Sequence, residues 1–243
     1  MRAGCLVLLA AVACLPLGRA GATEPGPLRP HTVLYRVLVK GIGAGDLELR
    51  LRADGAPGQY RYESVPHPST LARLFISAKS RETSRFHLGP DGVVPESYHL
   101  DDGGSHKDDI VLGYDWDKAR VSGRAAGKPV DLPATSGTQD VMSIRAAILY
   151  DLAAGKSQAE YAMIDGDEVK TFVYRSAGRE TIKTAQGDYD TLVWVSARKG
   201  SDGHDKTWKY WYAPALAYLP VRAVQLEDGR ERLVFELRRA TLD

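Results

Sequence analysis

The stretch TVLYRVLVKGIGAGDLELRLRA, residues 32–53, predicts a β-hairpin. In both halves apolar and polar side chains alternate, which is the period of a strand with one side on a core and the other in water. The apolar positions are Val33, Tyr35, Val37, Val39, Leu47, Leu49 and Leu51. Gly41, Gly43 and Gly45 between the halves permit a tight or bulged connection. The hairpin therefore indicates a half-buried antiparallel sheet.

The same alternation returns in short segments along the rest of the chain. Turn signals such as Asp54-Gly55, Asp165-Gly166 and Asp228-Gly229 separate these segments. The further strand candidates are residues 59–65, 79–88, 96–101, 108–115, 120–124, 160–164, 169–176, 180–184, 191–198, 206–212, 219–226 and 232–238. Many short alternating strands with few helices are typical of an antiparallel sheet that is strongly curved or closed. We therefore predict a mainly β fold, built as a half-barrel or open barrel around one α-helix.

The predicted helix lies in TQDVMSIRAAILYDLAAG, residues 138–155. Its apolar residues recur at intervals of three and four, which indicates an amphipathic helix over residues 140–154. These residues are Val141, Ile144, Ile148 and Leu152. Thr138 or Asp140 can cap its start and Gly155 can end it. We expect the helix to lie across the concave face of the sheet, where its apolar stripe closes the core. A second, short helix is predicted over residues 69–75.

The N-terminus has the three parts of a secretory signal peptide. Arg2 supplies the positive charge, residues 4–17 form an apolar run, and Ala20-Gly21-Ala22 offers a cleavage site. The apolar run is short for a membrane span, which needs about 20 residues. We therefore expect a signal peptide over residues 1–22, a proline-rich linker over 23–30 and a single β-rich domain over 31–243. The alternative is a lipoprotein, in which Cys14 would be lipidated.

Composition excludes several classes of protein. Cys5 and Cys14 are the only cysteines of the chain, and both precede the expected cleavage point, so the mature chain has no disulfide and no thiol nucleophile. The chain carries 32 basic and 31 acidic residues without a basic stripe, which argues against a nucleic-acid partner. No second apolar segment is long enough to cross a membrane.

Five blocks of sequence, taken in order, resemble one bacterial family of exported proteins. The blocks are YRVLVKGIGAGDLELRL (35–51), GVVPESYHL (92–100), QDVMSIRAAILYDL (139–152), YDTLVWV (189–195) and WYAPALAYLPVRA (211–223). The family is the exported "domain of unknown function 3108" family, and the resemblance runs over residues 31–238. It implies no settled activity. It implies a fold similar to the lipoprotein-localisation carriers and receptors, in which a curved antiparallel sheet encloses a helix.

The aromatic segment WKYWYAPALAYLP, residues 208–220, is open to two interpretations. On a strand, Trp208, Tyr210 and Tyr212 share one face, and Trp211 lies on the other. Pro214 cannot donate to a strand ladder, so the strand should end just before it. The segment is either a hairpin whose aromatic side fills the core, or one in which Trp211 and Tyr212 line the mouth of an apolar cavity.

We expect a lid over such a cavity in Leu71, Leu74, Phe75 and Ile76, beside the aromatic hairpin. Leu74, Phe75 and Ile76, if exposed, would form an apolar patch that soluble monomers rarely leave uncovered. The alternative is that these side chains pack on the sheet. The candidate ligand-binding residues are Leu71, Leu74, Phe75, Ile76, Trp194, Trp208, Trp211 and Tyr212.

No catalytic residue, metal site or cofactor is predicted. The histidines and aspartates of HLDDGGSHKDD, residues 99–109, could ligate a metal, but their spacing fits no EF-hand or HExxH pattern, and the two glycines already explain a turn. Ser196 and Lys199 spell S-x-x-K, but residues three apart on a strand point to opposite faces. No G-x-S-x-G, P-loop or Rossmann pattern occurs in the mature chain.

The function expected is that of a periplasmic, non-enzymatic binding protein. Its partner would be a lipid of the cell envelope or the acyl chains of a lipoprotein, taken up on a concave apolar surface. The alternative is an envelope protein-protein interaction or assembly factor with a filled core and no small ligand. A hydrolase is the least favoured interpretation, since no catalytic motif is found, although a pair of carboxylates from two distant strands would leave no mark in the sequence.

Overall fold

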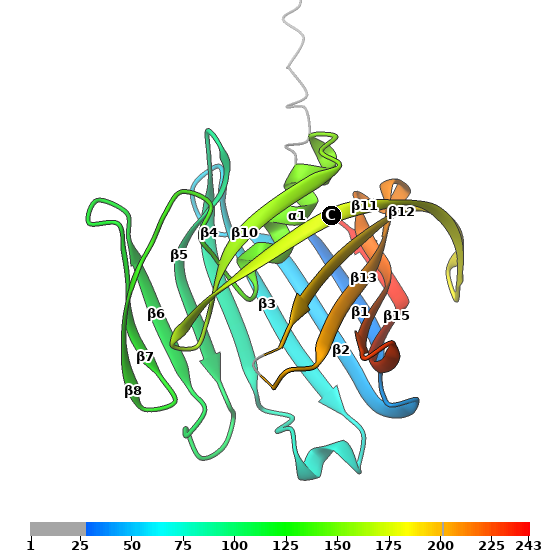
Figure 1. Cartoon of the computed structure of the whole chain (residues 1–243), viewed down its shortest axis with the longest axis horizontal. Helices are drawn as coiled ribbons and strands as arrows, with labels where there is room; N and C mark the ends of the chain where they lie inside the picture. The colour runs from blue at the N-terminus through cyan, green and yellow to red at the C-terminus, as the bar shows by residue number, and fades with distance from the viewer. Residues whose placement is uncertain (1–27, 201) are drawn as a thin grey trace, which may run out of the picture.

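The computed structural model describes residues 28–200 and 202–243, and these form one large curved sheet around one helix (Figure 1). The predicted signal peptide, Cys5, Cys14 and the first part of the proline-rich linker lie outside the described residues. The strands are β1 (His31–Val39), β2 (Ile42–Ala53), β3 (Gln59–Pro68), β4 (Arg81–Gly89), β5 (Gly92–Asp101), β6 (Ile110–Asp115), β7 (Arg120–Ala125), β8 (Lys128–Pro133), β9 (Gln139–Asp140), β10 (Gln158–Asp165), β11 (Glu168–Thr184), β12 (Gly187–Lys199), β13 (Asp205–Ala213), β14 (Leu219–Glu227) and β15 (Arg230–Leu242). The helices are α1 (Ser143–Ala153) and two 3-10 turns, η1 (Ala72–Leu74) and η2 (Pro214–Leu216).

Neighbouring strands of the sheet are almost all neighbours in the sequence. The order is β8-β7-β6-β5-β4-β3-β2-β1-β15-β14-β13-β12-β11-β10-β9. The first and last strands pair with each other in the middle of the sheet, with His31 opposite Leu242, and this joins two antiparallel meanders. The short β9 is parallel to β10, and the other pairs are antiparallel. β8 and β9 are the two edges, so the sheet is not closed, and the predicted curved, open, mainly β fold with one helix is confirmed.

The hairpin of β1 and β2 forms as its alternation predicts. Val33, Leu49 and Leu51 are buried on the inner face of the sheet. Lys40 and Gly41 make the two-residue turn, and both have positive φ, as a type I′ turn requires. Gly45 has a φ of +123° at a bulge in β2, where Ala44 is the extra residue, and a Cβ built on Gly45 would lie 2.3 Å from the His67 carbonyl oxygen. The hairpin therefore depends on glycine at this position.

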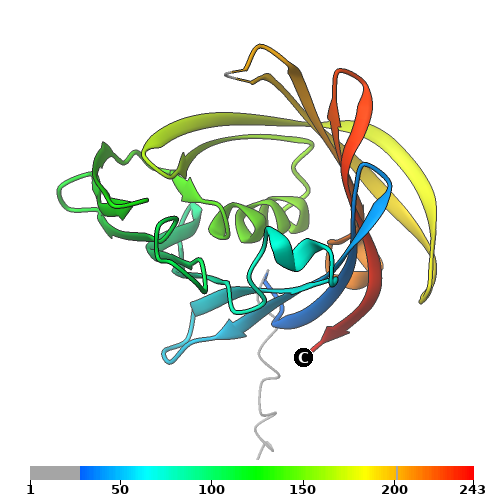
Figure 2. The same ribbon diagram turned by 90° about the horizontal axis from the view of Figure 1, so that it is seen from below.

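Helix α1 lies in the hollow of the sheet, as the view from below shows (Figure 2). Both of its ends are fixed by buried carboxylates. The Asp140 side chain accepts hydrogen bonds from the backbone N–H groups of Met142 and Ser143, both 2.8 Å long, and from the Ser84 hydroxyl of β4 at 2.7 Å. At the other end, the Tyr161 hydroxyl of β10 donates to Asp151 over 2.7 Å. The helix is therefore held to both halves of the sheet.

Several predicted boundaries differ from the structure. The helix begins at Ser143 rather than at residue 140, because Gln139 and Asp140 pair with β10 as β9. It is buried on most sides instead of being amphipathic, since sheet surrounds it. Residues 69–75 form only the single turn η1. The strands predicted over 169–176 and 180–184 are one long strand, β11, and β8 and β9 were not predicted. Leu28, placed in the linker by the sequence, is buried in the core.

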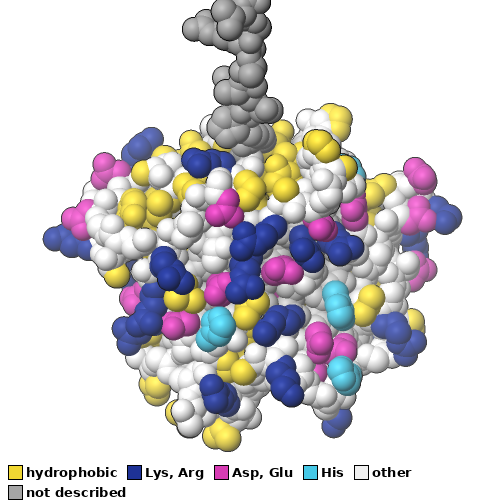
Figure 3. Space-filling model, turned by 180° about the vertical axis from the view of Figure 1, so that it is seen from behind, with side chains coloured by type: hydrophobic (Ala, Val, Ile, Leu, Met, Phe, Trp, Pro, Cys, Tyr) yellow, Lys and Arg dark blue, Asp and Glu magenta, His cyan; other side chains and the backbone are white. Residues whose placement is uncertain are grey.

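Charged side chains of both signs are interspersed over the outer surface (Figure 3). Ion pairs connect neighbouring outer positions, such as Arg61 with Glu63 at 3.6 Å and Arg85 with Asp54 at 3.2 Å. Exposed pairs of this kind contribute little to stability, about 0–1 kcal/mol each. The sheet is therefore stabilised mainly by the burial of its inner face. None of the helices in the described part of the chain is long and apolar enough to cross a membrane.

A cavity between the helix and the concave sheet

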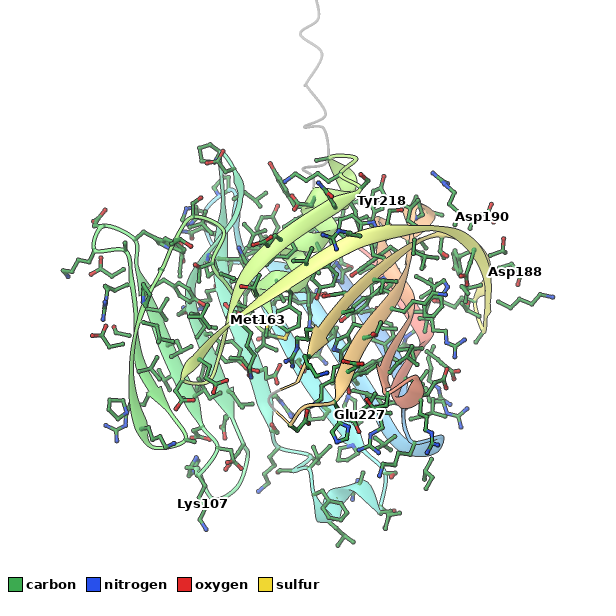
Figure 4. All side chains as sticks on the ribbon, viewed as in Figure 1. Lys107, Met163, Asp188, Asp190, Tyr218 and Glu227 are labelled. Carbon is green, nitrogen blue, oxygen red and sulfur yellow. The ribbon has the colours of Figure 1, made fainter. Side chains whose placement is uncertain are left out.

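A cavity of about 260 Å³ lies between α1 and the inner faces of strands from both meanders. Its lining comes from α1 and from eight strands, β1, β2, β3, β10, β11, β13, β14 and β15. The apolar lining includes Leu47 and Leu49 of β2, Ala223 of β14, and Leu233 and Phe235 of β15. Met163 of β10, labelled in Figure 4, lines it near the middle of the molecule. The cavity is therefore a hollow that lies in the main core and opens partly to solvent.

One face of α1 forms a wall of the cavity. The residues on this face are Val141, Ile144, Arg145, Ile148 and Leu149. Their spacing of three, four, seven and eight residues is that of one face of an α-helix, and Val141 lies just before its first turn. The fully buried Met142, Ala146 and Leu152 lie outside this set. The helix thus packs mainly on β5, with further contacts to β4, β9 and β10, and leaves one face free toward the cavity.

The opposite wall is aromatic. Trp208, Tyr210 and Tyr212 alternate along β13 and point inward, with ring centroids 5.5 Å and 5.6 Å apart in stacked arrangements. Phe235 of β15 stacks on Trp208 at 6.3 Å, and Tyr174 of β11 lies 6.1 Å from Tyr210. These rings form a continuous apolar surface facing the helix. Such a surface can hold hydrocarbon by contact and dispersion.

Arg145 is the only charged residue among those described that line the cavity. Its Nε atom is inaccessible to solvent and has no hydrogen-bond partner. Burial works against the charge of the guanidinium, but the acidic groups of Tyr210, Tyr62, Glu82 and Tyr35 outweigh this and hold its pKa above the ordinary value. The side chain as a whole remains partly accessible because it faces the cavity. The cavity therefore contains a permanent positive charge.

The five tyrosines of the lining are neutral at physiological pH. Burial raises the pKa of Tyr62 and of Tyr210 to about 12, and raises the pKa values of Tyr35, Tyr174 and Tyr212 well above the usual value. The Tyr35 hydroxyl donates to the Pro220 carbonyl oxygen at 2.8 Å, which ties β1 to β14. Because they stay protonated, these hydroxyls add polarity to the cavity without adding charge.

The structure brings three of the candidate ligand-binding aromatics together on the inner face. Trp208 and Tyr212 line the cavity. Trp194 is 1% exposed and packs behind the lining, with its ring centroid 6.3 Å from that of Tyr212. Trp211 lies on the outer face instead, where its indole N–H donates to Glu180 at 2.7 Å. The ammonium group of Lys209 lies over the Trp211 ring, 4.5 Å from its centroid. Trp211 is thus separated from the cavity by the sheet.

The four candidate lid residues lie outside the cavity lining. Leu71, Leu74, Phe75 and Ile76 are 62%, 74%, 86% and 46% exposed, so they do not pack on the sheet. They surround η1 at the lower edge of the sheet, and Figure 2 shows this turn in front of α1. Their segment starts directly after Pro68, and Pro66 pairs with Leu47 of the cavity lining. The segment therefore lies next to the cavity without closing it.

The other polar groups considered from the sequence lie away from the cavity. Ligand atoms of Asp101, Asp102, His106 and Asp109 come within 4.8 Å of one another in the loop after β5. The Asp102 carboxylate accepts hydrogen bonds from backbone N–H groups of this loop, which accounts for its position. On β12, Ser196 is buried on the inner face and Lys199 is exposed, so the S-x-x-K pair does not meet.

Arg145 was missed in the sequence. The predicted apolar stripe runs through Val141, Ile144, Ile148 and Leu152, and Arg145 is not among the predicted site residues. Arg145 nevertheless lies beside this stripe, because it is four residues after Val141 and three before Ile148. A charged residue beside an apolar stripe was therefore the available signal.

Comparison with known proteins places the chain in a family and confirms its fold. The sequence model described as "Protein of unknown function (DUF3108)" matches residues 34–236. A β-barrel-like protein of the domain of unknown function DUF1849 from Brucella abortus is similar over 89% of this chain and 98% of its own, with 11% identity and a TM-score of 0.55. This likeness shows a shared fold.

Two more distant structures carry names from the cell envelope. A candidate lipoprotein from Parabacteroides distasonis covers 88% of this chain and 96% of its own, with 10% identity and a TM-score of 0.41. A candidate outer membrane lipoprotein-sorting protein domain from Vibrio parahaemolyticus covers 88% and 86%, with 9% identity and a TM-score of 0.30. No curated protein matches the sequence. None of these descriptions names an enzyme family.

Proposed function

The chain belongs to the DUF3108 family, and because that family has no assigned function, we propose one from the cavity. The protein is a non-enzymatic binding protein of the cell envelope. It holds a hydrocarbon chain, from a lipid or from the acyl group of a lipoprotein, between α1 and the concave face of the sheet. The observation that carries this proposal is the apolar and aromatic cavity of about 260 Å³.

The size and lining of the cavity suit hydrocarbon. Protein interiors are close-packed, and an engineered apolar cavity of about 150 Å³ already stays dry and binds benzene. At about 260 Å³ the cavity here is larger, and all but one of its described lining side chains are apolar or aromatic. A methylene group that leaves water for such a site gains about 0.8 kcal/mol. An acyl chain would therefore bind by filling the cavity and forming van der Waals contacts with its apolar and aromatic lining.

The proposed location in the envelope rests on the sequence of the N-terminus. Residues 1–22 have the charged, apolar and small-residue regions of a signal peptide. The mature chain would have no cysteine, so the fold would not depend on the redox state of its compartment. A soluble carrier or receptor in the periplasm would meet lipids that must cross water between two membranes.

The proposed entry is the lower edge of the sheet, beside η1. The side chains of Leu74 and Phe75 are among the most exposed large apolar groups of the described chain. The segment is tied to β2 by the Ser69 N–H, which donates to the Ala44 carbonyl oxygen at 2.8 Å. Exposed apolar side chains at this edge can receive a chain from a membrane or a partner before it enters the cavity.

The groups that line the cavity do not suit catalysis. Enzyme sites bring together titratable groups whose pKa values lie near the working pH. Here the titratable lining groups are a permanently charged arginine and tyrosines whose pKa values are raised by burial. We therefore propose binding and not turnover.

An envelope assembly factor is the second candidate function. The exposed apolar side chains around η1 favour it, because such a patch can also be a contact surface for another protein. The binding protein would hold a hydrocarbon chain in the cavity, whereas the assembly factor would have no small ligand there.

The proposal is tested by the lipid content of protein purified from the periplasm under native conditions. Extraction and mass spectrometry should find lipid in the wild type. Ala223→Phe should carry much less, because Ala223 lines the cavity and a phenyl ring would fill part of it. Ala197→Phe is the matched control, since Ala197 is exposed on β12. Equal, empty preparations of all three proteins would instead favour the assembly factor.

A further inference from the structure

We propose that the ligand of the cavity is a single-chain amphipath with an anionic head group, and that Arg145 binds this head group inside the cavity. The head group is a carboxylate or a phosphate monoester. This inference rests on the proposed binding function and names the class of ligand that the same cavity takes.

The guanidinium of Arg145 has no partner in the protein. Its Nε is buried and without a hydrogen bond. Among the residues that the structure describes, no aspartate or glutamate oxygen lies within the 4.0 Å of an ion pair with it. Buried charges in proteins are normally paired, because an unpaired one costs several kcal/mol. The missing partner is therefore expected to come from outside the chain.

Three other buried titratable groups of this core have partners, in contrast to Arg145. Asp140 is bound by two backbone N–H groups and by Ser84. Asp151 is bound by Tyr161 and by the ammonium group of Lys156. His31 contacts Tyr62 and a backbone carbonyl oxygen. Gln139 Oε1 and the Tyr114 hydroxyl are also buried without a partner, but they are neutral and do not line the cavity. Arg145 is therefore the one unpaired charge among the described residues that line the cavity.

Glu82 is the carboxyl group whose charge contributes to the raised pKa of Arg145. It extends from β4, and burial raises its pKa, while Arg145 acts in the opposite direction. The Glu82 carboxylate does not come within the 4.0 Å of an ion pair with the guanidinium. An entering anion would therefore find a cation without a direct ion-pair partner.

The geometry favours recognition of an oxyanion. A guanidinium offers its N–H groups as a planar fork that matches a carboxylate or a phosphate. The phenol groups of Tyr35, Tyr62 and Tyr210 lie close enough to influence the guanidinium, and they stay protonated. Ile144 and Ile148 flank Arg145 on the same helix face. A head group at Arg145 would therefore have hydrocarbon surface on either side for its chain.

The volume of the cavity favours one chain. About 260 Å³ is less than twice the size of an engineered cavity that holds benzene. Two or three acyl chains would need far more room. A single chain can place its first carbons against the aromatic wall of β13 and extend toward the lower edge of the sheet.

The test is isothermal titration calorimetry with three probes of equal chain length, used below their critical micelle concentrations. The probes are dodecanoate, dodecyl phosphate and dodecanol. The wild type should bind at least one of the anions about tenfold or more tightly than the alcohol, as a charge-assisted hydrogen bond predicts. The anion that binds more tightly identifies the head group.

The matched variants are Arg145→Met and Arg145→Lys. The methionine variant keeps the apolar part of the side chain and should lose the preference for anions while it keeps its affinity for dodecanol. The lysine variant should retain part of the preference. Retained dodecanol binding also shows that each variant is folded.

Two results would overturn the inference. If the wild type binds dodecanol as tightly as both anions, or if the preference survives in Arg145→Met, Arg145 does not select the head group and the binding function alone stands. If none of the three probes binds to the wild type, the proposed binding function fails together with the inference.

Discussion

Two buried titratable residues hold the elements that surround the cavity, and their pKa values shift in opposite senses. Burial raises the pKa of Asp140 to about 6, although its hydrogen bonds with Ser143, Ser84 and Met142 act against this. Burial lowers the pKa of His31 to about 4, although its hydrogen bond to the Arg29 carbonyl oxygen acts against this. Because that carbonyl can only accept, Nδ1 of His31 carries the proton and Nε2 accepts from Tyr62.

These shifts predict opposing contributions to the pH dependence of stability. The contribution of Asp140 is fully present below the ordinary pKa of 3.8 and is lost as the pH rises toward about 6. The contribution of His31 is fully present above 6.5 and is lost as the pH falls toward about 4. Each is worth about 3 kcal/mol, at about 1.4 kcal/mol per unit of pKa. In the wild type the two should largely cancel between pH 4 and 6.5.

Urea denaturation at a series of pH values separates the contributions of Asp140 and His31 to the free energy of unfolding. In Asp140→Asn only the His31 contribution remains, so the free energy of unfolding should rise with pH more steeply than in the wild type. In His31→Gln it should fall with rising pH. Parallel curves for all three proteins would show that neither residue has a shifted pKa.

Arg145 should destabilise the protein when no ligand occupies the cavity. Replacing a buried, unpaired charge by an apolar side chain of similar size removes its desolvation penalty. Arg145→Met should therefore raise the free energy of unfolding by about 1–4 kcal/mol. Arg239→Met on the exposed side of β15 is the matched control and should change it by less than about 0.5 kcal/mol. A destabilised Arg145→Met would mean that the guanidinium is satisfied in the native state.

At the scale of the elements, the longer strands could be predicted from the sequence, and short strands such as β9 could not. The alternation of residues 32–53 predicts β1, β2 and the inner face that they present. The recurrence of Ile144 and Ile148 predicts α1. Periodicity does not reveal β9, because its two residues are strand only through their pairing with β10. It also cannot show that sheet surrounds α1, so the helix was expected to be amphipathic.

The β1–β2 hairpin gives a sharp test of local geometry. Gly45→Ala should destabilise the protein by about 1–3 kcal/mol, since its positive φ and the close His67 carbonyl oxygen leave no room for a Cβ. Gly43→Ala is the control, because a Cβ there meets nothing within 4 Å. Thermal unfolding of both variants measures the difference. Equal loss in the two would show that the bulge does not require glycine.

The η1 segment gives a test of function at the same scale. Leu74→Ser with Phe75→Ser removes two highly exposed apolar side chains, so the stability should change by less than about 1 kcal/mol. If the segment receives the ligand, the rate of dodecanoate uptake in a stopped-flow assay should fall while the affinity changes less. An unchanged rate would place the entry elsewhere.

At the scale of the whole molecule, the fold and the cavity depend on each other. The pairing of β1 with β15 makes one continuous sheet from two meanders, and the helix occupies only part of the hollow that results. The sequence predicts the open sheet and the enclosed helix. It does not predict the empty volume, because this depends on how far apart side chains from α1 and eight strands are held. For the same reason Trp208 and Tyr212 were candidates without a defined position.

The most direct test of the cavity as a ligand site is anomalous X-ray diffraction from crystals grown with 12-bromododecanoate. We expect the bromine peak in the space between α1 and the inward rings of β13, with the carboxylate within hydrogen-bond distance of the Arg145 guanidinium. A cavity that stays empty at saturating ligand, with bromine bound only on the outer surface, would contradict the binding function.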